Sequence, residues 1–280
     1  MNSDQQPQAK FNQAVEWLQG SNKIAVFSGA GMSASSGINT FRDEGGFWQR
    51  FPPEQFANWK GLLQTALLEP DLLADFLIAI LEPIALAEPN SAHLAIAELA
   101  NYKEVCVVTQ NIDQLHQSAG SQQVLEIHGS LFEIIRYPEE QETNVLSRDD
   151  LKKIVVELKL AKEQFWKGPK LLSAIQPLIG ANLNSFHRPR IVLFGDQLAE
   201  PDWTNAQLAA SECDLLVSIG TSQSVYPAAG LPQLAKENGS RVIVIDPQVS
   251  GGDLWLAEKS EEILPQLVES AFSHKEEQNG

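Results

Sequence analysis

Short runs of consecutive apolar residues recur along the chain, and each has the length of a buried β-strand. A run that is apolar on both faces is typical of a parallel strand covered by helices on each side of its sheet. Six runs fit this pattern: Lys23–Ser28, Val105–Thr109, Val124–Ile127, Arg190–Phe194, Asp214–Ile219 and Arg241–Ile245. Most end at a glycine or a polar residue, as strands do when their carboxyl ends form a binding site.

Helical patterns, with apolar positions every three or four residues, separate many of these runs. The predicted helices are Phe11–Leu18, Ala92–Leu99, Thr204–Ala210, Ala228–Glu237 and Glu261–Phe272. Ser91 is the predicted N-cap of the second helix. This alternation of strands and helices predicts an α/β fold, a doubly wound, Rossmann-like parallel sheet of about six strands.

Two stretches interrupt the alternation. Phe47–Pro89 contains the strongly apolar helical segment Asp71–Leu81, whereas Leu131–Pro189 has no convincing core strand. Further helical patterns cover Arg148–Gln164 and Leu171–Ile179. We therefore predict a smaller, mainly helical domain inserted into the sheet domain. The predicted ranges are 20–46, 90–130 and 189–270 for the Rossmann-like domain, 47–89 and 131–188 for the small helical domain, and 273–280 for a flexible tail.

Composition narrows the class of protein. Hydrophobic residues make up 43% of the 280 residues, enough for a large core, and no apolar run approaches the roughly 20 residues that span a bilayer. The polar amino terminus lacks the apolar core of a signal peptide, so we expect a cytoplasmic protein without membrane partners. The net charge of −16 argues against nucleic acid as a partner. It is compatible with attraction of lysine-rich peptides, although a soluble acidic surface is the simpler interpretation.

A glycine-rich turn follows the first predicted strand. The spacing Gly29-x-Gly31-x-x-Ala34 fits the dinucleotide-binding fingerprint, in which the first glycine permits a tight turn and the second lets a phosphate approach the backbone. The following amides, together with Ser33 and Ser35, are able to face an anion at a helix amino terminus. The second strand ends at Gln110 rather than at a ribose-binding acid, which argues against an ordinary hydride-transferring dehydrogenase.

Five segments in order extend this pattern over most of the chain. They are Gly29–Ile38 with Thr40-Phe41-Arg42, Thr109–His116, Glu126-Ile127-His128-Gly129-Ser130, Val192–Asp196, and Gly220-Thr221-Ser222 with Val225 and Pro227. Their order and spacing closely resemble the motifs of the sirtuins, the NAD-dependent protein deacylases. The resemblance runs from about residue 20 to residue 265.

The resemblance implies that NAD is consumed as a co-substrate and that an acyl-lysine protein or peptide is the partner. Asp113 and Ile112 would take the nicotinamide carboxamide, Phe41 would shield the reactive ribose carbon, and Arg42 and Ser33 would serve the pyrophosphate. The implied cofactor-binding residues are Gly29, Ala30, Gly31, Ser33, Phe41, Arg42, Gln110, Asn111, Ile112, Asp113, Gly220, Thr221, Ser222 and Asp246. The implied substrate-binding residues are Val192, Phe194, Gly195 and Asp196.

The same resemblance implies that His128 and Asn111 are catalytic. Gln110 and Asn111 would hold the ribose hydroxyls and an ordered water, and His128 would act as general base on a ribose hydroxyl. An imidazole suits this role because its ordinary pKa of about 6.5 lies near working pH. The products would be free lysine, nicotinamide and an O-acyl-ADP-ribose.

Simpler interpretations accompany these assignments. In isolation His128 fits a core histidine, and Phe41 a core aromatic residue. Asn111 and Asp113 are also good helix caps, a role that is compatible with ligand binding. His93 and His116 lie on helices, and we interpret both as structural. The spacing Asp113-x-x-His116 is compatible with a metal pair, but it has no further metal ligands nearby.

Three departures from the sirtuin pattern affect the expected function. The chain has only Cys106 and Cys213, so it lacks the two cysteine pairs of the family's structural zinc ribbon, and we expect no zinc. Phe76–Leu81 lacks the Tyr-x-x-Arg pair that accompanies removal of acidic acyl groups. Either this segment lines an apolar acyl site, which favours acetyl or longer fatty chains, or it packs in the domain core.

The third departure is Asp246, where asparagine is usual. Its carboxylate would accept ribose hydroxyls but repel a 2′-phosphate, which favours NAD over NADP. Asp196 in place of the common glutamate is a milder change. The alternatives to a deacylase are an NAD glycohydrolase or mono-ADP-ribosyltransferase on the same scaffold, or a nucleotide-sensing module without turnover. We expect a monomer.

Overall fold

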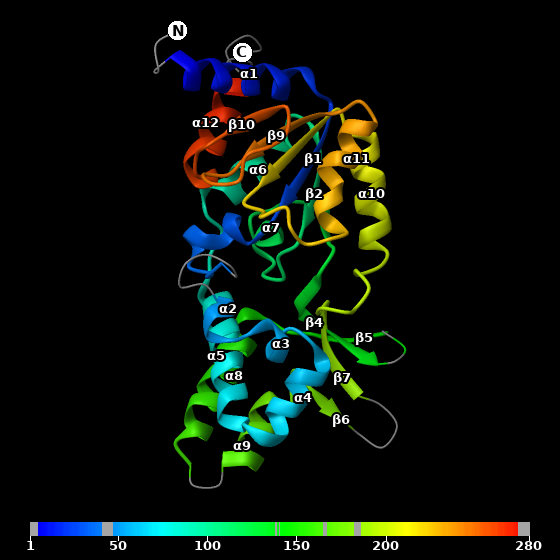
Figure 1. Cartoon of the computed structure of the whole chain (residues 1–280). Coiled ribbons are helices and arrows are strands. Elements are labelled where there is room, and N and C mark those ends of the chain that lie inside the picture. The colour runs from blue at the N-terminus through cyan, green and yellow to red at the C-terminus, as the bar shows by residue number, and fades with distance from the viewer. Residues whose placement is uncertain are drawn as a thin grey trace. The chain divides into compact units, whose positions relative to one another are not determined.

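The computed structural model describes residues 5–40, 47–137, 139, 141–164, 167–181 and 186–273. The chain folds as two compact units, shown in Figure 1. The first comprises Met1–Ser36, Glu88–Ile127 and Glu200–Gly280, and the second comprises Gly37–Ala87 and His128–Ala199. Residues 37–40, 128–130 and 189–199, which the sequence patterns grouped with the Rossmann-like domain, thus lie in the second unit.

A six-stranded parallel sheet forms the centre of the first unit. Its strands lie in the order β10-β9-β8-β1-β2-β3, and every neighbouring pair is parallel. The strands are β1 (Lys23–Ser28), β2 (Glu104–Thr109), β3 (Val124–Glu126), β8 (Leu215–Ile219), β9 (Arg241–Ile245) and β10 (Leu254–Leu256). The predicted doubly wound sheet of about six strands is therefore confirmed.

Helices cover both faces of this sheet because alternate strand residues point to opposite sides. On one face α1 (Gln5–Gly20), α6 (Ser91–Leu99) and α12 (Ser260–Phe272) enclose a core that includes Ile24 and Val26 of β1. On the other face lie α10 (Asp202–Glu212) and α11 (Leu231–Glu237), which follows the short η2 (Ala228–Gly230). The short elements η1 (Ala30–Ser36) and α7 (Leu115–Ser118) follow β1 and β2.

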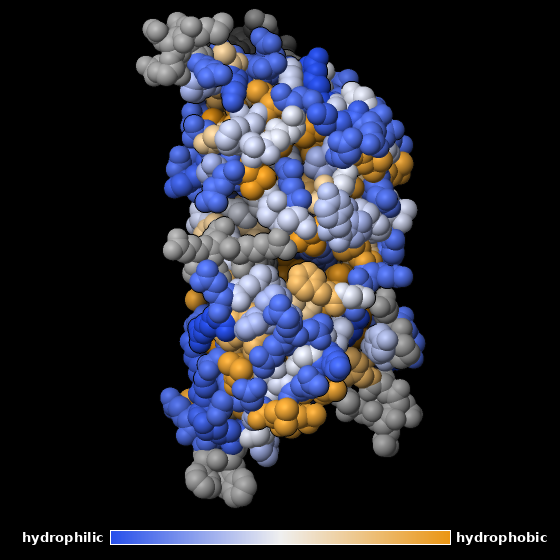
Figure 2. Space-filling model, viewed as in Figure 1, coloured by the Kyte–Doolittle hydropathy of each residue, from blue (hydrophilic) through white to orange (hydrophobic). Residues whose placement is uncertain are grey.

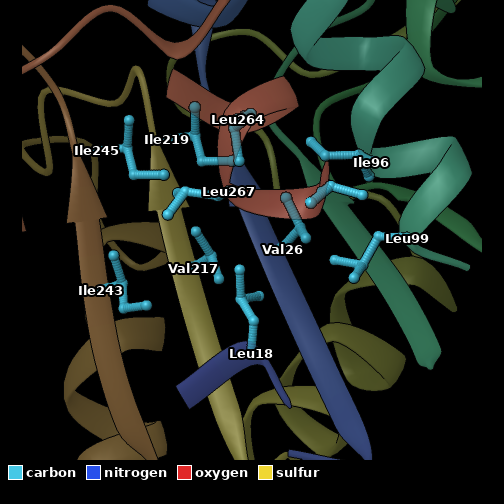
Figure 3. A pocket seen from close by; sticks show the side chains of 11 residues that line it. Leu18, Val26, Ile96, Leu99, Val217, Ile219, Ile243, Ile245, Leu264 and Leu267 are labelled. Carbon is cyan, nitrogen blue, oxygen red and sulfur yellow. The ribbon is translucent and has the colours of Figure 1, made fainter. Parts of the chain in front are cut away.

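The core under α1, α6 and α12 contains one narrow gap, shown in Figure 3. Its volume is about 10 Å³, at the lower limit for a single water molecule. The lining is aliphatic throughout, with Leu18, Val26, Ile96, Val217 and Leu267 among its side chains. This gap is a packing imperfection of the core and not a ligand site.

One of the predicted core strands belongs elsewhere. The run Arg190–Phe194 was predicted as a parallel strand, but β7 (Phe186–Ile191) pairs antiparallel with β4 (Gly129–Tyr137) in the second unit. The sixth parallel strand is instead β10, whose three residues are too few for a periodic pattern. Apolar character alone indicated a buried strand here but not which sheet it joins.

The second unit combines helices with a smaller sheet. Its helices are α2 (Phe47–Arg50), α3 (Pro53–Phe56), α4 (Trp59–Leu68), α5 (Pro70–Leu86), α8 (Arg148–Lys162) and α9 (Lys167–Ile175). Its four strands lie in the order β5-β4-β7-β6, with β5 (Gln141–Val145) and β6 (Gly180–Ala181) at the edges. All three pairings in this sheet are antiparallel.

The statement that 131–189 lacks a core strand was wrong. In β4 the buried residues are Leu131, Phe132, Ile134 and Ile135, a spacing that resembles a helical stripe more than the alternation of a strand. The cause is local irregularity, because the register shifts between Ser130 and Ile134 on one side and between Ile134 and Ile135 on the other. The predicted helices in this stretch did form, as α8 and α9.

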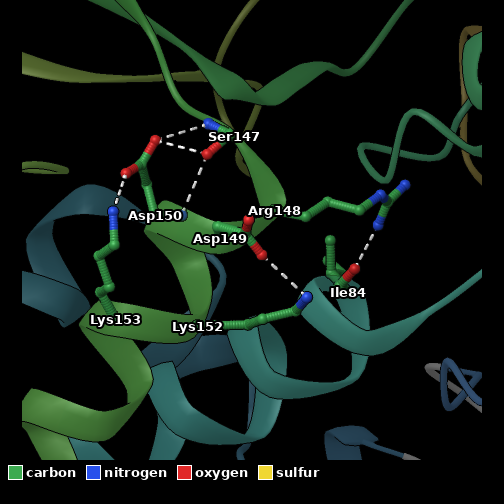
Figure 4. A network of polar contacts seen from close by, with 7 residues as sticks. All are labelled: Ile84, Ser147, Arg148, Asp149, Asp150, Lys152 and Lys153. Carbon is green, nitrogen blue, oxygen red and sulfur yellow. Dashed lines mark hydrogen bonds and ion pairs between the residues drawn. The ribbon is translucent and has the colours of Figure 1, made fainter.

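Helix α8 begins with a capping box, shown in Figure 4. The Ser147 hydroxyl accepts from the Asp150 amide, and the Asp150 carboxylate accepts from the Ser147 amide at 3.0 Å, which satisfies two amide donors. Arg148 donates to the Ile84 carbonyl at the end of α5. Further along, Lys159 and Lys162 pair with Glu82 and Asp75 of α5, and the buried stripe of α8 packs on the same helix. Helix α8 is thereby fixed to α5.

The other predicted helices also formed, with longer bounds in most cases. The predicted cap of α6 was wrong by one residue. Asn90 is the N-cap, since its Oδ1 accepts from the Ala92 and His93 amides, whereas the Ser91 hydroxyl donates to the Glu261 carbonyl. The predicted tail lies outside the described residues from 274 onward.

The face seen in Figure 2 is predominantly hydrophilic, with smaller apolar areas between the charged ones. Among the helices of the described residues, none combines the length and the apolar character needed to cross a bilayer.

The small unit is expected to depend on the apolar stripe of α8. Leu158 is fully buried whereas Leu160, two residues further on, is 55% exposed. Leu158→Ala should lower the free energy of unfolding by roughly 2–5 kcal/mol, because it removes buried side-chain atoms and leaves a cavity. Leu160→Ala is the matched control and should cost less than about 0.5 kcal/mol. Urea unfolding of both variants checks this, and equal effects would contradict a packed α8.

Candidate active site

The glycine turn after β1 lies directly against the backbone that follows β8. The Gly29 amide donates to the Ile219 carbonyl at 3.1 Å, and the Gly31 amide donates to the Gly220 carbonyl at 2.9 Å. A Cβ at Gly29 would lie 2.9 Å from the Gly220 oxygen, and one at Gly31 would lie 2.9 Å from the Gly220 Cα. Both positions therefore require glycine for a contact within the protein, besides any approach of a phosphate.

The position of Gly220 also requires glycine, for two reasons. Its φ of +56° lies in the left-handed region that favours glycine, and a Cβ there would lie 2.3 Å from the Met32 nitrogen. The three glycines thus form one close backbone contact between the ends of neighbouring strands β1 and β8.

Three polar side chains meet at this turn in a directed series of hydrogen bonds. Asn111 Nδ2 donates to the Gly29 carbonyl at 3.1 Å and to the Ser33 hydroxyl at 3.0 Å, and Ser33 Oγ donates to Asp113 Oδ2 at 2.7 Å. Because a carbonyl only accepts, the Gly29 contact fixes which side-chain atom of Asn111 is nitrogen. Ser33 is fully buried, so its hydroxyl serves this series.

Asp113 lies one residue before Gln114, the N-cap of α7, and its carboxylate still accepts from the first amide of that helix. Its Oδ1 accepts from the Leu115 amide at 3.0 Å, while Oδ2 accepts from Ser33. The Asn111 amide instead donates to Thr109 Oγ1 at 3.0 Å, so this residue is tied back to the end of β2. Ile112 lies half-buried between them. The segment after β2 is thus held against the glycine turn by side chains on both sides of Ile112.

Two further strand ends contribute polar groups at the same edge of the sheet. Gln110 Nε2 donates to Thr221 Oγ1 at 2.9 Å, which links the ends of β2 and β8, and the exposed Ser222 and Ser224 hydroxyls lie 2.7 Å apart. After β9, Asp246 Oδ1 accepts from the Gln248 and Val249 amides. The carboxyl ends of β1, β2, β8 and β9 therefore bring the predicted residues of the first unit together. Ala30, in the turn itself, is half-buried.

Two buried histidines lie beneath this cluster. The rings of His93 on α6 and His116 on α7 are 4.9 Å apart between centroids. Burial lowers the pKa of His93 to about 4, and burial together with the nearby His93 lowers the pKa of His116 to about 3. Both imidazoles are therefore neutral near neutral pH, in keeping with a structural role rather than acid–base work.

The predicted catalytic His128 and the predicted substrate residues lie in the second unit, whereas Asn111 lies in the first. His128 is half-buried and its carbonyl accepts from the Val192 amide at 2.9 Å. Val192 opens the segment that turns at Leu193–Asp196, where the Asp196 amide donates to the Leu193 carbonyl and Gly195 has a φ of +98°. This turn leaves the Phe194 side chain 53% exposed.

Sequence reasoning missed the residues that hold this turn. Trp59 Nε1 donates to Asp196 Oδ2 at 2.9 Å, and the Phe194 amide donates to the Ala57 carbonyl at 2.8 Å. The guanidinium of the buried Arg188 lies 4.7 Å from the Trp59 ring, a cation–π contact. No local pattern predicts these pairings, since Trp59 and Asp196 are 137 residues apart. The missed cap Asn90, in contrast, carried a readable Asn-x-x-His signal.

Phe41 and Arg42 lie outside the described residues. Within the described part of the chain, no group of three or more His, Cys, Asp or Glu side chains is arranged to hold a metal ion.

Comparison with known proteins identifies the family. The Sir2 family model matches residues 29–227. The match spans all the motifs from the glycine turn to Pro227, and the chain therefore belongs to the Sir2 family, the sirtuins.

Individual relatives agree over nearly the full length. An NAD-dependent protein deacylase of Desulfosudis oleivorans is 37% identical over 267 residues, covering 92% of this chain and 94% of the relative. A solved Sir2 homologue in complex with NAD superposes with a TM-score of 0.75 at 29% identity, covering 94% of each chain. The structure of Sir2Af2 bound to a myristoylated histone peptide has a TM-score of 0.68 at 29% identity, covering 96% of this chain and 99% of that one.

Because burial lowers the pKa of His93 and of His116, we predict that the free energy of unfolding decreases in acid. In the unfolded chain a histidine titrates near 6.5, whereas the folded pKa values are about 4 and about 3. Below pH 6.5 the unfolded state therefore binds more protons, so stability is complete above that pH and is lost as pH falls toward 4 and below. Urea midpoints between pH 5 and 7 measure the slope, and His93→Gln should reduce it. A midpoint that does not change over this range would refute the assignment.

Proposed function

We propose that this chain is an NAD-dependent protein lysine deacylase, a deacetylase or longer-chain deacylase that releases nicotinamide and an O-acyl-ADP-ribose. The observation that carries the proposal is the series Asn111–Ser33–Asp113 around the glycine turn, in a chain of the Sir2 family. The relatives' names and bound ligands support NAD as co-substrate and an acyl-lysine peptide as substrate.

The residues of the first unit fit a dinucleotide. The contact between Gly31 and Gly220 excludes a side chain at both glycines, which leaves backbone for a pyrophosphate, served by Arg42 and by the backbone at Ser33, whose hydroxyl is engaged by Asn111 and Asp113. Asp113 and Ile112 would hold the nicotinamide carboxamide. The remaining assignments place Gln110 and Asn111 at the ribose and Phe41 beside the glycosidic bond.

Bound NAD would supply the ribose carbon that the acyl oxygen attacks as nicotinamide leaves. His128 then accepts a proton from a ribose hydroxyl, and Asn111 orients the ribose and an ordered water. Two of the protons of Asn111 are already directed at Gly29 and Ser33, so its carbonyl oxygen is the atom that turns to the ribose. The turn 192–196 receives the acyl-lysine peptide through Val192, Phe194, Gly195 and Asp196.

The side chains on helix α5 indicate which acyl group the protein accepts. Phe76 packs with Phe47, Phe51 and Phe56, and its ring lies 4.7 Å from that of Phe56. This contact supports a core role for Phe76, whereas Leu77 and Ala79 are only partly buried on the same cluster. An acidic acyl group would find no cation among residues 76–81, so we propose acetyl or a longer fatty acyl group as substrate.

We also propose that NAD is preferred over NADP. Asp246 Oδ1 is held by two backbone amides, which fixes the carboxylate at the end of β9. A fixed negative charge there accepts ribose hydroxyls and repels a 2′-phosphate.

His128→Ala should abolish deacylation while NAD binding persists, because a general base contributes roughly 10²–10⁴-fold to rate. Turnover is measured as nicotinamide and acyl-ADP-ribose formed with a panel of acyl-lysine peptides. The control is His187→Ala, on β7 of the same unit, which should remain near wild type. Free ADP-ribose formed without peptide would instead favour a glycohydrolase, and near-wild-type turnover of His128→Ala would refute the catalytic assignment.

Trp59→Phe should weaken peptide recognition. It keeps an aromatic ring over Arg188 but removes the hydrogen bond to Asp196, so the KM for the acyl-peptide should rise roughly two- to tenfold. The KM for NAD should not change. Trp17→Phe, in the first unit, is the matched control. A rise in both KM values, or in neither, would contradict a role in holding the peptide turn.

Zinc is not expected to support the fold or the reaction. Both cysteines, Cys106 and Cys213, are buried beside the parallel sheet of the first unit, and the second unit has none. Elemental analysis of protein purified without chelator should find far less than one zinc per chain, and chelator should leave the unfolding midpoint unchanged. One full equivalent of zinc would overturn this proposal.

A further inference from the structure

Two groups of hydrogen bonds hold the glycine turn, one that starts from Asn90 and one that starts from Asn111. On one side Asn90 Nδ2 donates to the Met32 carbonyl at 2.8 Å and to Ser36 Oγ at 3.1 Å. The Asn90 amide donates to His93 Nδ1 as the second half of the α6 capping box. His93 is thereby tied through Asn90 to the turn.

The other group starts from Asn111. Its amide donates to Thr109 Oγ1, Ser28 Oγ donates to the same oxygen at 3.0 Å, and Ser28 Oγ lies 2.9 Å from His116 Nε2. All of these side chains except Asn111 are buried. His116 is thereby tied to the segment that reaches Ser33 and Asp113.

The two groups of hydrogen bonds approach each other at the two histidines. Their rings are 4.9 Å apart and meet at an interplanar angle of 63°. His93 Nε2 and His116 Nδ1 are both buried, and neither has a hydrogen-bond partner among the described residues. A buried polar atom without a partner is costly, so two of them on neighbouring rings call for an explanation.

The partners of each ring determine where its proton lies. A backbone N–H only donates, so His93 Nδ1 must be the unprotonated nitrogen, and the proton of the neutral ring is on Nε2. The unpartnered Nε2 of His93 is therefore a donor, on a ring that lies next to that of His116.

The hydroxyls of Ser28 and Thr109 determine which ring nitrogen of His116 carries the proton. Ser28 has one proton and gives it to Thr109 Oγ1, so His116 Nε2 must donate to Ser28, which leaves Nδ1 as an acceptor. The reversed order would place a proton on Nδ1 and set two buried donors, His116 Nδ1 and His93 Nε2, against each other with no acceptor. Only the first order makes the two rings complementary.

We propose that His93 and His116 form a donor–acceptor pair, joined through one buried water, that links the two groups of hydrogen bonds around the glycine turn. The pair makes both histidines positioning residues for Asn111 and Ser33. That positioning role rests on the proposed function, whereas the pairing of the rings does not.

Long-range ¹H–¹⁵N correlation spectra of the wild-type protein at neutral pH test the pairing. Both rings should be neutral, with the proton on Nε2 and Nδ1 unprotonated. A contact from the His93 Nε2 proton to a slowly exchanging water that also contacts the His116 ring supports the pair. A proton on Nδ1 of either ring, or a charged ring, would overturn the proposal even if no variant folds.

Binding of NAD and of ADP-ribose, measured by calorimetry, tests the positioning role. His93→Asn keeps an acceptor for the Asn90 amide but removes the Nε2 donor, and it should weaken both ligands roughly two- to tenfold. His116→Gln retains an amide donor that reaches Ser28, and it should bind both ligands more tightly than His116→Leu does.

The matched control is Ser240→Ala, which removes a buried hydroxyl that donates to the Cys213 carbonyl in the same unit, away from this series. It should bind both ligands within about twofold of wild type, as a variant without a special role. Wild-type affinity in all the histidine variants would overturn the positioning role. Absence of binding by the wild type would instead refute the proposed function and leave the spectra to decide the pairing.

Discussion

The backbone at Gly29 and Gly31 lies so close to that of Gly220 that none of these three positions has room for a side chain. A Cβ at Gly220 would lie 2.3 Å from the Met32 nitrogen, and the left-handed φ of Gly220 excludes most other residues independently. This contact brings the carboxyl ends of β1 and β8 together, and in the proposed function it keeps side chains away from the backbone that binds the pyrophosphate. The polar groups of the site are arranged around it.

The polar series depends on that contact because each member bonds to the turn or to its neighbour in the series. Asn111 reaches the Gly29 carbonyl and Ser33, and Ser33 reaches Asp113. Charge within the series is confined to Asp113, which accepts from a hydroxyl and a backbone amide. Directed donors and acceptors in a buried setting hold a single arrangement, which is the condition for binding a ligand without reorganisation.

How much of this could be read from the sequence differs from element to element. The bounds of β1 and β9 were predicted to the residue, because continuous apolar runs bounded by polar residues have few other interpretations. Strand β7 was placed in the wrong sheet, since hydrophobicity does not encode a pairing partner. Strand β4 was missed because register shifts disturb its alternation. The helix α8, in contrast, has both a cap signal and a regular apolar stripe.

The candidate site likewise has parts that the sequence predicts and parts that it does not. The segments that carry Asn111, Asp113 and Thr221 were predicted from motifs because their spacing is local. The contacts that join these segments run between different elements of the fold: Gln110 after β2 bonds to Thr221 after β8, and Trp59 of α4 bonds to Asp196. The rings of His93 and His116 meet from α6 and α7. Such pairs leave no local periodicity, so only the folded chain reveals them. The sequence likewise does not show that Gly31 is required for a contact within the protein, because the backbone that excludes a side chain there belongs to Gly220, which follows another strand.

A crystal structure of the protein with NAD tests the central claim most directly. The account predicts the pyrophosphate on the backbone of the glycine turn, the nicotinamide carboxamide at Asp113, and the adjacent ribose within hydrogen-bond distance of Asn111. A nucleotide bound elsewhere on the protein, or a glycine turn that remains empty at saturating NAD, would contradict it.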